Sequence, residues 1–279
     1  MTKIIIDSSG ELTDEMKNCT DIIIESAALT LEVDGKVYID DENLDVQKYV
    51  DVMENSKEKV QTAAVSPEQF LEKYKDDCDQ VFVVTLSSKL SATYANAMLA
   101  KQMYLDEVGE KAIHVFDSFS ASVAETVSAL KIMELTRSGL SHSEIVEKAS
   151  EFIKRKKTFF ILDRFDNLVK SGRMSSHIAK IASVLSIKLV CKEKDGEIAL
   201  HDKARGYKNA LKKMIDTIVN EKIDFENNVL AISHCRALEK ATELKSELLK
   251  KVKFKDIVIV EMRGLSSTYA AAGSIIVSY

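Results

Sequence analysis

Short apolar runs rich in isoleucine and valine alternate with helical patterns along the first half of the chain. The clearest runs cover residues 3–6, 80–85 and 113–116. The longest helical pattern covers residues 121–137, and Ser141 with Glu144 predicts the capped start of another helix. Strands that alternate with helices in this way favour a parallel sheet with crossover helices. Residues 1–155 are therefore predicted to form an α/β domain.

The pattern changes after about residue 158, where predicted strands follow one another with little helix between them. They cover residues 158–162, 187–192, 197–201, 228–233, 255–261 and 273–278. Two helical patterns stand among them, at residues 207–220 and 238–251. The pairs Asp34-Gly35 and Asp195-Gly196 predict a hairpin turn in each half. Residues 156–279 are therefore predicted to form an α+β domain, and the lysine-rich segment 154–157 marks the boundary.

Composition and charge exclude several kinds of partner. The 279-residue chain is 46% hydrophobic and 30% charged, with a formal net charge of -5. It has no polybasic block of the kind that phosphate backbones require, so nucleic acid is excluded as a partner. It opens without the apolar segment of a secretory signal and has no apolar run of about 18 residues, so a cytoplasmic location is expected. The four cysteines and five histidines are dispersed, so neither a metal site nor a disulfide framework is predicted.

Small hydroxyl residues follow the predicted strands at the positions where open α/β sheets bind ligands. Three such segments are residues 7–9, 87–94 and 117–120, and a fourth hydroxyl-bearing segment, residues 62–67, precedes a predicted helix. Taken singly, each serine or threonine is interpreted most simply as a helix cap that contributes about 1 kcal/mol. Four such segments in one half favour a second interpretation. Hydroxyls and helix N-terminal amides grouped at one sheet edge form a neutral pocket for an anion.

Motifs of the common catalytic classes are absent from the sequence. There is no G-x-S-x-G elbow, no glycine-rich phosphate loop and no H-E-x-x-H segment. A hydrolase or transferase with Ser91 or Ser118 as its nucleophile is an alternative, but no base is recognisably paired with either. His234 ends a predicted strand, where it is either a pocket residue or a satisfied strand end. The chain is therefore predicted not to be an enzyme and to need no cofactor.

A distinctive segment of the second half covers residues 163–175. It carries Arg173 between a Ser-Gly break and an apolar helical pattern at residues 178–185. Arg173 either pairs with Asp163 or Asp166, or lies beside a cleft where its guanidinium binds a carboxylate or phosphate. The local sequence favours neither interpretation.

The order of these segments resembles the DegV family, the fatty-acid-binding subunits of bacterial fatty acid kinase, and the resemblance covers the whole chain. Asp7-Ser8-Ser9 lies near the start, and residues 62–67 stand where the family has T-S-Q-P-S. Residues 87–94 resemble its S-S-x-L-S-G-T-Y, and Asp117-Ser118 resembles its I-D-S. The remaining matches are residues 168–175 with L-x-K-G-G-R-I-S and residues 203–205 with K-x-R.

The resemblance implies a DegV-like fold, with a largely antiparallel sheet in the second half and one long-chain fatty acid buried between the halves. It implies that hydroxyls hold the ligand carboxylate, and the positions expected to do so are Thr62, Ser91, Ser118 and Ser266. The acyl tunnel or cleft is expected to involve Phe119, Arg173, Ile178, Ile181 and Leu185. The resemblance also implies an ATP-dependent kinase subunit that phosphorylates the bound carboxylate, and it allows transient contact with a membrane.

The chain departs from the family pattern near its C-terminus. Where relatives carry G-T-H-T-G-P-G, residues 264–270 read Gly-Leu-Ser-Ser-Thr-Tyr-Ala. Ser266 thus replaces a pocket histidine, and Tyr269 adds bulk. Three interpretations stay open: the carboxylate is held by hydroxyls alone, the ligand differs, or the protein is a lipid or anion sensor without a kinase partner.

Overall fold

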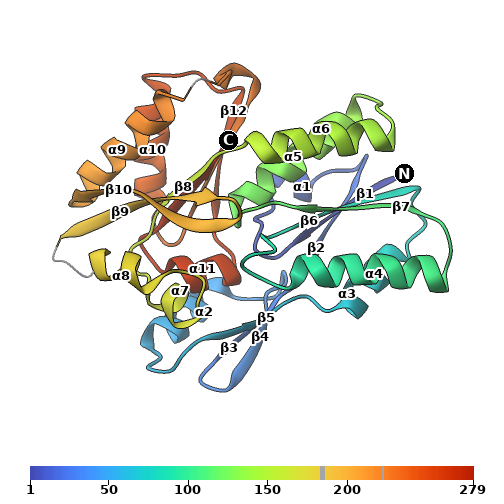
Figure 1. The fold of residues 1–279 in the computed structure, drawn as a ribbon, viewed down its shortest axis with the longest axis horizontal. Coiled ribbons are helices and arrows are strands. Elements are labelled where there is room, and N and C mark those ends of the chain that lie inside the picture. Colours follow the sequence, from blue (N-terminus) through green and yellow to red (C-terminus); the bar gives the residue numbers. More distant parts are fainter. Residues whose placement is uncertain (183–185, 222) are drawn as a thin grey trace.

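A computed structural model describes residues 1–182, 186–221 and 223–279, and Figure 1 shows its fold. The first half is built on a four-stranded sheet in which all neighbouring strands are parallel. In spatial order its strands are β2 (Ile23–Ala27), β1 (Thr2–Asp7), β6 (Gln80–Thr85) and β7 (Ala112–Asp117). The predicted parallel sheet is confirmed, because all three predicted strands of the first half lie in it.

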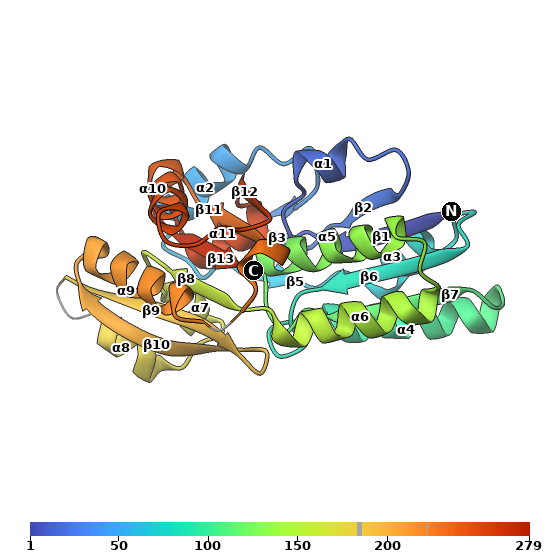
Figure 2. The same cartoon turned by 90° about the horizontal axis from the view of Figure 1, so that it is seen from above.

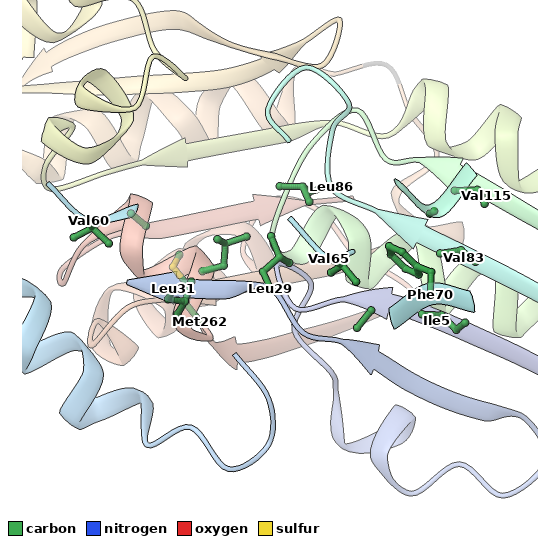
Figure 3. Packing of buried hydrophobic residues seen from close by; sticks show 14 of the residues in the cluster. Ile5, Leu29, Leu31, Val60, Val65, Phe70, Val83, Leu86, Val115 and Met262 are labelled. Atoms are coloured by element: carbon green, nitrogen blue, oxygen red, sulfur yellow. The ribbon is translucent and has the colours of Figure 1, made fainter. Parts of the chain in front are cut away.

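Helices cover both faces of this sheet, because its strands carry apolar residues on both sides. The helices are α3 (Pro67–Tyr74), α4 (Thr93–Glu107), α5 (Val123–Arg137) and α6 (His142–Arg155). In Figure 1, α5 and α6 lie above the strands, and α3 and α4 lie below them. Ile4 and Ile6 of β1 pack on the α5 and α6 side, whereas Ile5 packs with Phe70 of α3, as Figure 3 shows. The predicted capping box of Ser141 and Glu144 is confirmed at the start of α6.

A small antiparallel sheet adjoins the first half and was not predicted as a separate layer. Its strands are β4 (Lys36–Ile39), β3 (Thr30–Val33) and β5 (Gln61–Ala63). The predicted turn at Asp34-Gly35 joins β3 to β4, with φ angles of 51° and 74°. Positive φ at both residues is what a type I′ hairpin turn requires. Two further helices lie in this region of the chain, α1 (Asp14–Lys17) and α2 (Val46–Asn55).

The second half is built on a six-stranded sheet that is mostly antiparallel, with β11 and β12 as its parallel pair. In spatial order its strands are β10 (Glu197–Arg205), β9 (Ile187–Lys194), β8 (Thr158–Ile161), β13 (Ile275–Ser278), β11 (Val229–His234) and β12 (Asp256–Glu261). The predicted mixed α/β class, with a parallel sheet first and a largely antiparallel sheet second, is confirmed.

Helices of the second half lie on both sides of this sheet. They are α7 (Asp166–Lys170), α8 (Ser176–Ala182), α9 (Tyr207–Val219), the 3-10 helix η1 (Phe225–Asn227), α10 (Leu238–Leu249) and α11 (Gly264–Ala270). Phe159 and Ile161 of β8 pack against α9 and α10, whereas Phe160 between them faces the first half. The predicted helix at 178–185 corresponds to α8, and residues 183–185 lie outside the described residues.

The hairpin of β9 and β10 reaches back to the first sheet. Its turn is the predicted Asp195-Gly196 pair, with φ angles of 54° and 84°. The Ser87 hydroxyl, just beyond β6, donates a hydrogen bond of 2.7 Å to the carbonyl oxygen of Gly196. The tip of this hairpin therefore closes over the carboxyl end of the parallel sheet.

Helix α5 packs against both sheets. It packs on β1 and β6 of the first sheet and on β11 and β13 of the second, and Figure 2 shows it beside both. Val123 and Val127 form an apolar cluster with Ala231 of β11. The predicted boundary at residues 155 and 156 falls in the short link between α6 and β8, and the division into two domains there stays a prediction. None of the helices in the described ranges has the length and apolar composition of a membrane span.

Candidate functional site

A cavity of about 330 Å³ lies where the carboxyl ends of β1, β6 and β7 meet the second sheet. Its apolar lining comes from both halves, and besides four alanines it comprises Leu29, Leu86, Leu90, Phe119, Phe160, Leu162, Leu168, Ile198, Leu265 and Ile276. Hydroxyl side chains interrupt this lining at Ser9, Thr62, Ser91, Ser120, Ser122, Thr158, Ser266 and Tyr269. The cavity thus lies beyond the carboxyl ends of the parallel strands, where open α/β sheets usually bind ligands. Apolar walls with a few hydroxyls suit an amphiphile that has one polar end.

Thr62 and Ser91, the two hydroxyls first expected to hold a carboxylate, both line the cavity. Thr62 lies on β5, and its hydroxyl is 2.8 Å from the Tyr269 hydroxyl. Ser91 lies in the loop after β6, and its hydroxyl is 2.9 Å from that of Thr93. The Ser91 oxygen also accepts a hydrogen bond of 3.3 Å from the backbone N–H of Thr93. Both side chains are thus held by neighbouring hydroxyls while they face the cavity.

Ser266 and Ser118, the other two expected hydroxyls, differ in position. Ser266 lines the cavity and donates a hydrogen bond of 2.8 Å to the carbonyl oxygen of Ser9. Ser118 is fully buried and is not part of the described lining of the cavity. Its hydroxyl donates to the carbonyl oxygen of Ser120 and accepts from the Ser120 N–H, at 3.2 Å in each case. The structure therefore does not bring Ser118 to the other three, because its hydroxyl closes its own loop.

That loop is strained where it meets the cavity. Phe119 and Ser122 have φ angles of 53° and 59°, values that cost a residue with a Cβ about 1–3 kcal/mol. The Asp117 carboxylate accepts a hydrogen bond of 2.8 Å from the Phe119 N–H. The Ser9 hydroxyl accepts one of 3.1 Å from the Ser122 N–H. These contacts hold Phe119 and Ser122 against the cavity despite the strain.

Arg173 lines the cavity and forms neither of the ion pairs considered from its sequence. Its Nε donates to the carbonyl oxygen of Leu90 at 3.1 Å, and its Nη1 donates to that of Ser171 at 2.9 Å. Asp166 instead pairs with Arg164, and Asp163 pairs with Lys188. The guanidinium therefore lies at the cavity with backbone carbonyls as partners, next to the loop that carries Ser91.

The three aliphatic residues expected in the acyl tunnel lie on or after α8. Ile178 and Ile181 are half-buried and pack against the main hydrophobic cluster, but the described lining of the cavity does not include them. Leu185 lies outside the described residues. The apolar lining comes instead from positions such as Phe160, Leu162 and Ile276, which depend on how the two sheets face each other.

Three buried carboxyl groups lie behind the hydroxyls of the cavity, and the sequence interpretation missed them. They are Asp7, Glu11 and Glu125, each at most 1% exposed. The Ser122 hydroxyl lies 2.9 Å from both carboxyl oxygens of Glu11. Neither carboxyl oxygen of Glu125 has a hydrogen-bond partner in the described part of the chain. A signal was present for two of them, because Asp7 ends the apolar run 4–6 and Glu125 interrupts the helical pattern 121–137, whereas Glu11 stands in a polar segment.

Burial sets the charge of these groups. It raises the pKa of Asp7 from 3.8 to about 7 and that of Glu11 from 4.5 to about 8. Burial, and next the charge of Asp7, raise the pKa of Glu125 well above its ordinary value. Neutral carboxyls can donate hydrogen bonds to the surrounding hydroxyls. Near neutral pH Glu11 is thus largely uncharged and Asp7 is about half ionised, so burial reduces the negative charge behind the hydroxyls of the cavity.

The remaining candidate groups lie away from the cavity. His234 is buried at the end of β11, where burial lowers its pKa and its Nδ1 lies 3.4 Å from the Ala237 N–H, so it is a satisfied strand end. No histidine belongs to the described lining of the cavity, so none is placed there as a base for Ser91. Among residues 1–182, 186–221 and 223–279, no group of three His, Cys, Asp or Glu side chains is arranged to hold a metal ion.

Comparisons with known proteins cover the whole chain. The family model for DegV, described as an uncharacterised protein family, matches residues 1–279. A DegV domain-containing protein of Streptococcus pyogenes serotype M1 is 32% identical over an alignment of 280 positions that covers 99% of this chain and 98% of that protein.

Solved structures of similar proteins carry fatty acids. A DegV family protein of Ruminococcus gnavus with vaccenic acid is 37% identical, with a TM-score of 0.94 over 100% of this chain and 99% of that one. The fatty acid kinase (Fak) B3 protein of Streptococcus pneumoniae, loaded with linoleic acid, is 30% identical, with a TM-score of 0.92 over 100% of this chain and 98% of that one. A DegV family protein of Eubacterium eligens loaded with heptadecanoic acid is 26% identical, with a TM-score of 0.91 over 100% of this chain and 99% of that one.

Proposed function

The chain belongs to the DegV family, and on this premise we propose that it binds one long-chain fatty acid in the cavity between its two sheets. The observation that carries the proposal is the cavity itself, whose apolar walls are interrupted by hydroxyls. The fatty acids in the similar Ruminococcus, Streptococcus and Eubacterium structures support the same ligand class. In this proposal residues 1–155 supply most of the head-group hydroxyls and residues 156–279 enclose the acyl chain.

Burial of the acyl chain supplies most of the affinity. Each buried methylene contributes roughly 0.8 kcal/mol, so a chain of about 14 methylenes gains roughly 11 kcal/mol before the entropic costs of binding. Phe119, Leu162 and Ile276 line the cavity where such a chain lies. Ile178 and Ile181 pack one step behind that lining in this proposal.

The carboxylate is held by hydroxyls. An unpaired carboxylate is costly to bury, so it needs donors wherever it leaves water. Thr62 and Ser91 supply these donors, with Ser266 nearby and the Arg173 guanidinium beside the Ser91 loop. The Ser118 hydroxyl stabilises the loop that carries Phe119, through its hydrogen bonds to Ser120, and in this proposal does not contact the ligand.

The protein presents its bound acid to an ATP-dependent kinase, which forms the acyl phosphate, and is not itself a catalyst. The likeness to the Streptococcus pneumoniae Fak B3 protein supports this role. No histidine belongs to the described lining of the cavity, and the Ser91 hydroxyl is paired with that of Thr93, which disfavours the alternative of a serine hydrolase. A null result with a serine-directed covalent probe is expected.

Native mass spectrometry of the purified protein tests the binding proposal. An adduct of one fatty acid per chain, released and identified after mild denaturation, is the expected result. Delipidated protein should take up an added acid of 14 to 18 carbons, the range of the ligands proposed here. Protein that is empty as purified and also refuses every added acid would refute the proposal.

A lipid or anion sensor without a kinase partner is the second candidate. It is favoured by residues 264–270, which form the helix α11 and place the Tyr269 hydroxyl against Thr62. Loaded protein mixed with a fatty acid kinase subunit and ATP separates the two candidates. Acyl phosphate formation supports the carrier, and its absence with retained binding supports the sensor.

A further inference from the structure

Tyr269 brings a phenol to the point where the head group is proposed to bind. It is the sixth residue of α11, far along the chain from Thr62 on β5. Its side chain lines the cavity, and its hydroxyl lies 2.8 Å from the Thr62 hydroxyl. The two hydroxyls therefore form a pair that faces the cavity from two different elements.

The helix that carries Tyr269 is fixed from several sides. Both carboxylate oxygens of Asp40 accept hydrogen bonds from its first amides, those of Gly264 at 3.0 Å and Leu265 at 2.8 Å. The neighbouring Thr268 shares a hydrogen bond with the Tyr49 hydroxyl, and its carbonyl oxygen accepts one of 2.7 Å from Asn167. A ligand that meets this phenol therefore meets a group already held in place, so little ordering entropy is lost on binding.

The pair of hydroxyls has a proton to spare. Each hydroxyl can donate one hydrogen bond, and only one of the two protons is used in the bond between them. The other remains available to a carboxylate oxygen, and the donor that uses it is polarised by the bond it accepts from its partner. A ligand carboxylate beside Thr62 is thus within reach of a chain of two hydroxyls, which is a stronger hydrogen-bond donor than the Thr62 hydroxyl alone.

Tyr269 borders two hollows. It lines the main cavity and a second, smaller hollow of about 40 Å³, whose lining includes Glu54, Arg164 and Lys170. Truncation to alanine would change packing as well as hydrogen bonding. Replacement by phenylalanine keeps the ring and removes the hydroxyl alone.

We propose that Tyr269 is a head-group residue of this chain, whose hydroxyl is bonded to that of Thr62 so that the pair donates its one free proton to the carboxylate of the bound fatty acid. The inference rests on the proposed function and adds to it the group that selects the ionised acid over its neutral derivatives. An ester keeps the acyl chain but presents weaker acceptors than a carboxylate. Tyr269 therefore contributes to the binding of the acid and not to that of the ester.

The test compares oleic acid with methyl oleate on delipidated, full-length protein. Apparent affinities are measured by displacement of a bound fluorescent long-chain acid, with thermal melting as the check on folding. Tyr269→Phe is expected to weaken oleic acid binding about tenfold or more and to leave methyl oleate within about twofold. Tyr38→Phe is the matched control, because Tyr38 packs edge-on against Tyr49 and is not part of the described cavity lining.

Two further measurements separate hydrogen bonding from packing. The carboxyl signal of oleic acid labelled with carbon-13 at C1 is expected to move between wild-type and Tyr269→Phe protein. Thr62→Val is expected to weaken oleic acid binding less in the Tyr269→Phe background than in the wild type, because the two hydroxyls act as a pair.

Each outcome decides the inference. Equal losses for the acid and the ester would mean that Tyr269 acts through packing, which overturns the inference while fatty acid binding stands. Unchanged acid affinity with an unmoved carboxyl signal would overturn it in the same way. Wild-type protein that takes up neither oleic acid nor methyl oleate would refute the proposed function and the inference together.

Discussion

Replacement of Glu11 by glutamine should change how the stability of the protein depends on pH. Glu11 is buried behind the cavity hydroxyls, and burial raises its pKa from 4.5 to about 8. Between these values the unfolded chain has released this proton, whereas the folded protein still holds it. The stability contributed by the neutral carboxyl is therefore complete below pH 4.5 and is lost as pH rises toward 8. Glutamine has no proton to release, so the variant lacks this dependence.

The magnitude follows from one proton. A difference of one bound proton changes the free energy of unfolding by about 1.4 kcal/mol per pH unit. From about pH 5.5 to 7.5, the stability of Glu11→Gln relative to wild type should therefore rise by roughly 2.7 kcal/mol. The amide can still donate to the Ser122 hydroxyl, which lies 2.9 Å from both carboxyl oxygens in the wild type.

Urea unfolding followed by circular dichroism at three pH values measures this difference on ligand-free protein. Differences in midpoint, multiplied by a common m-value, give the relative stabilities. The exposed Glu151 offers a matched control, and Glu151→Gln should run parallel to wild type across the window. If Glu11→Gln also ran parallel to wild type, Glu11 would be ionised in the folded protein, and the reasoning from burial would be wrong.

Three other experiments test the site and the fold. Ser91→Ala should weaken fatty acid binding about tenfold. Ser118→Ala should leave affinity within about twofold and lower the free energy of unfolding by about 1 kcal/mol. Equal losses of affinity in a displacement assay would contradict the assignment of Ser91, and not Ser118, to the ligand. Leu162→Trp should fill part of the cavity and shift the bound ligand toward shorter acids in native mass spectra, and an unchanged ligand profile would place the acyl chain elsewhere. Gly196→Ala should lower the melting temperature more than Gly35→Ala. Both glycines have positive φ, but a Cβ at Gly196 would lie 2.7 Å from a serine hydroxyl, whereas one at Gly35 would meet nothing within 4 Å. Similar decreases in melting temperature would mean that the backbone strain alone matters.

Local chemistry made much of the fold predictable. Isoleucine-rich runs such as residues 3–6 are too short for helices and became strands of the parallel sheet. The turns at Asp34-Gly35 and Asp195-Gly196 follow from the tolerance of aspartate and glycine for positive φ. The capping box of Ser141 and Glu144 likewise depends only on residues three positions apart.

Long-range contacts account for what could not be predicted. Residues 264–270 form a helix whose first two amides donate hydrogen bonds to the Asp40 carboxylate. Asp40 is at least 224 positions away in the sequence, so no local pattern predicts this contact. The contact between Tyr269 and Thr62 likewise joins distant parts of the sequence. Ser118 matches its family motif, yet whether its hydroxyl faces a cavity or its own loop depends on the backbone of residues 118–120, which the motif does not specify.

Helix α5 has a consequence for how the protein unfolds. Its apolar side, with Val123 and Val127, is covered by Ala231 of the second sheet, while the rest of the helix covers the first sheet. Separation of the two sheets would expose this side to water, so each sheet gains stability from the presence of the other. We therefore expect the molecule to melt as one cooperative unit, and we expect a fragment that ends at residue 155 to carry an exposed apolar helix and to aggregate.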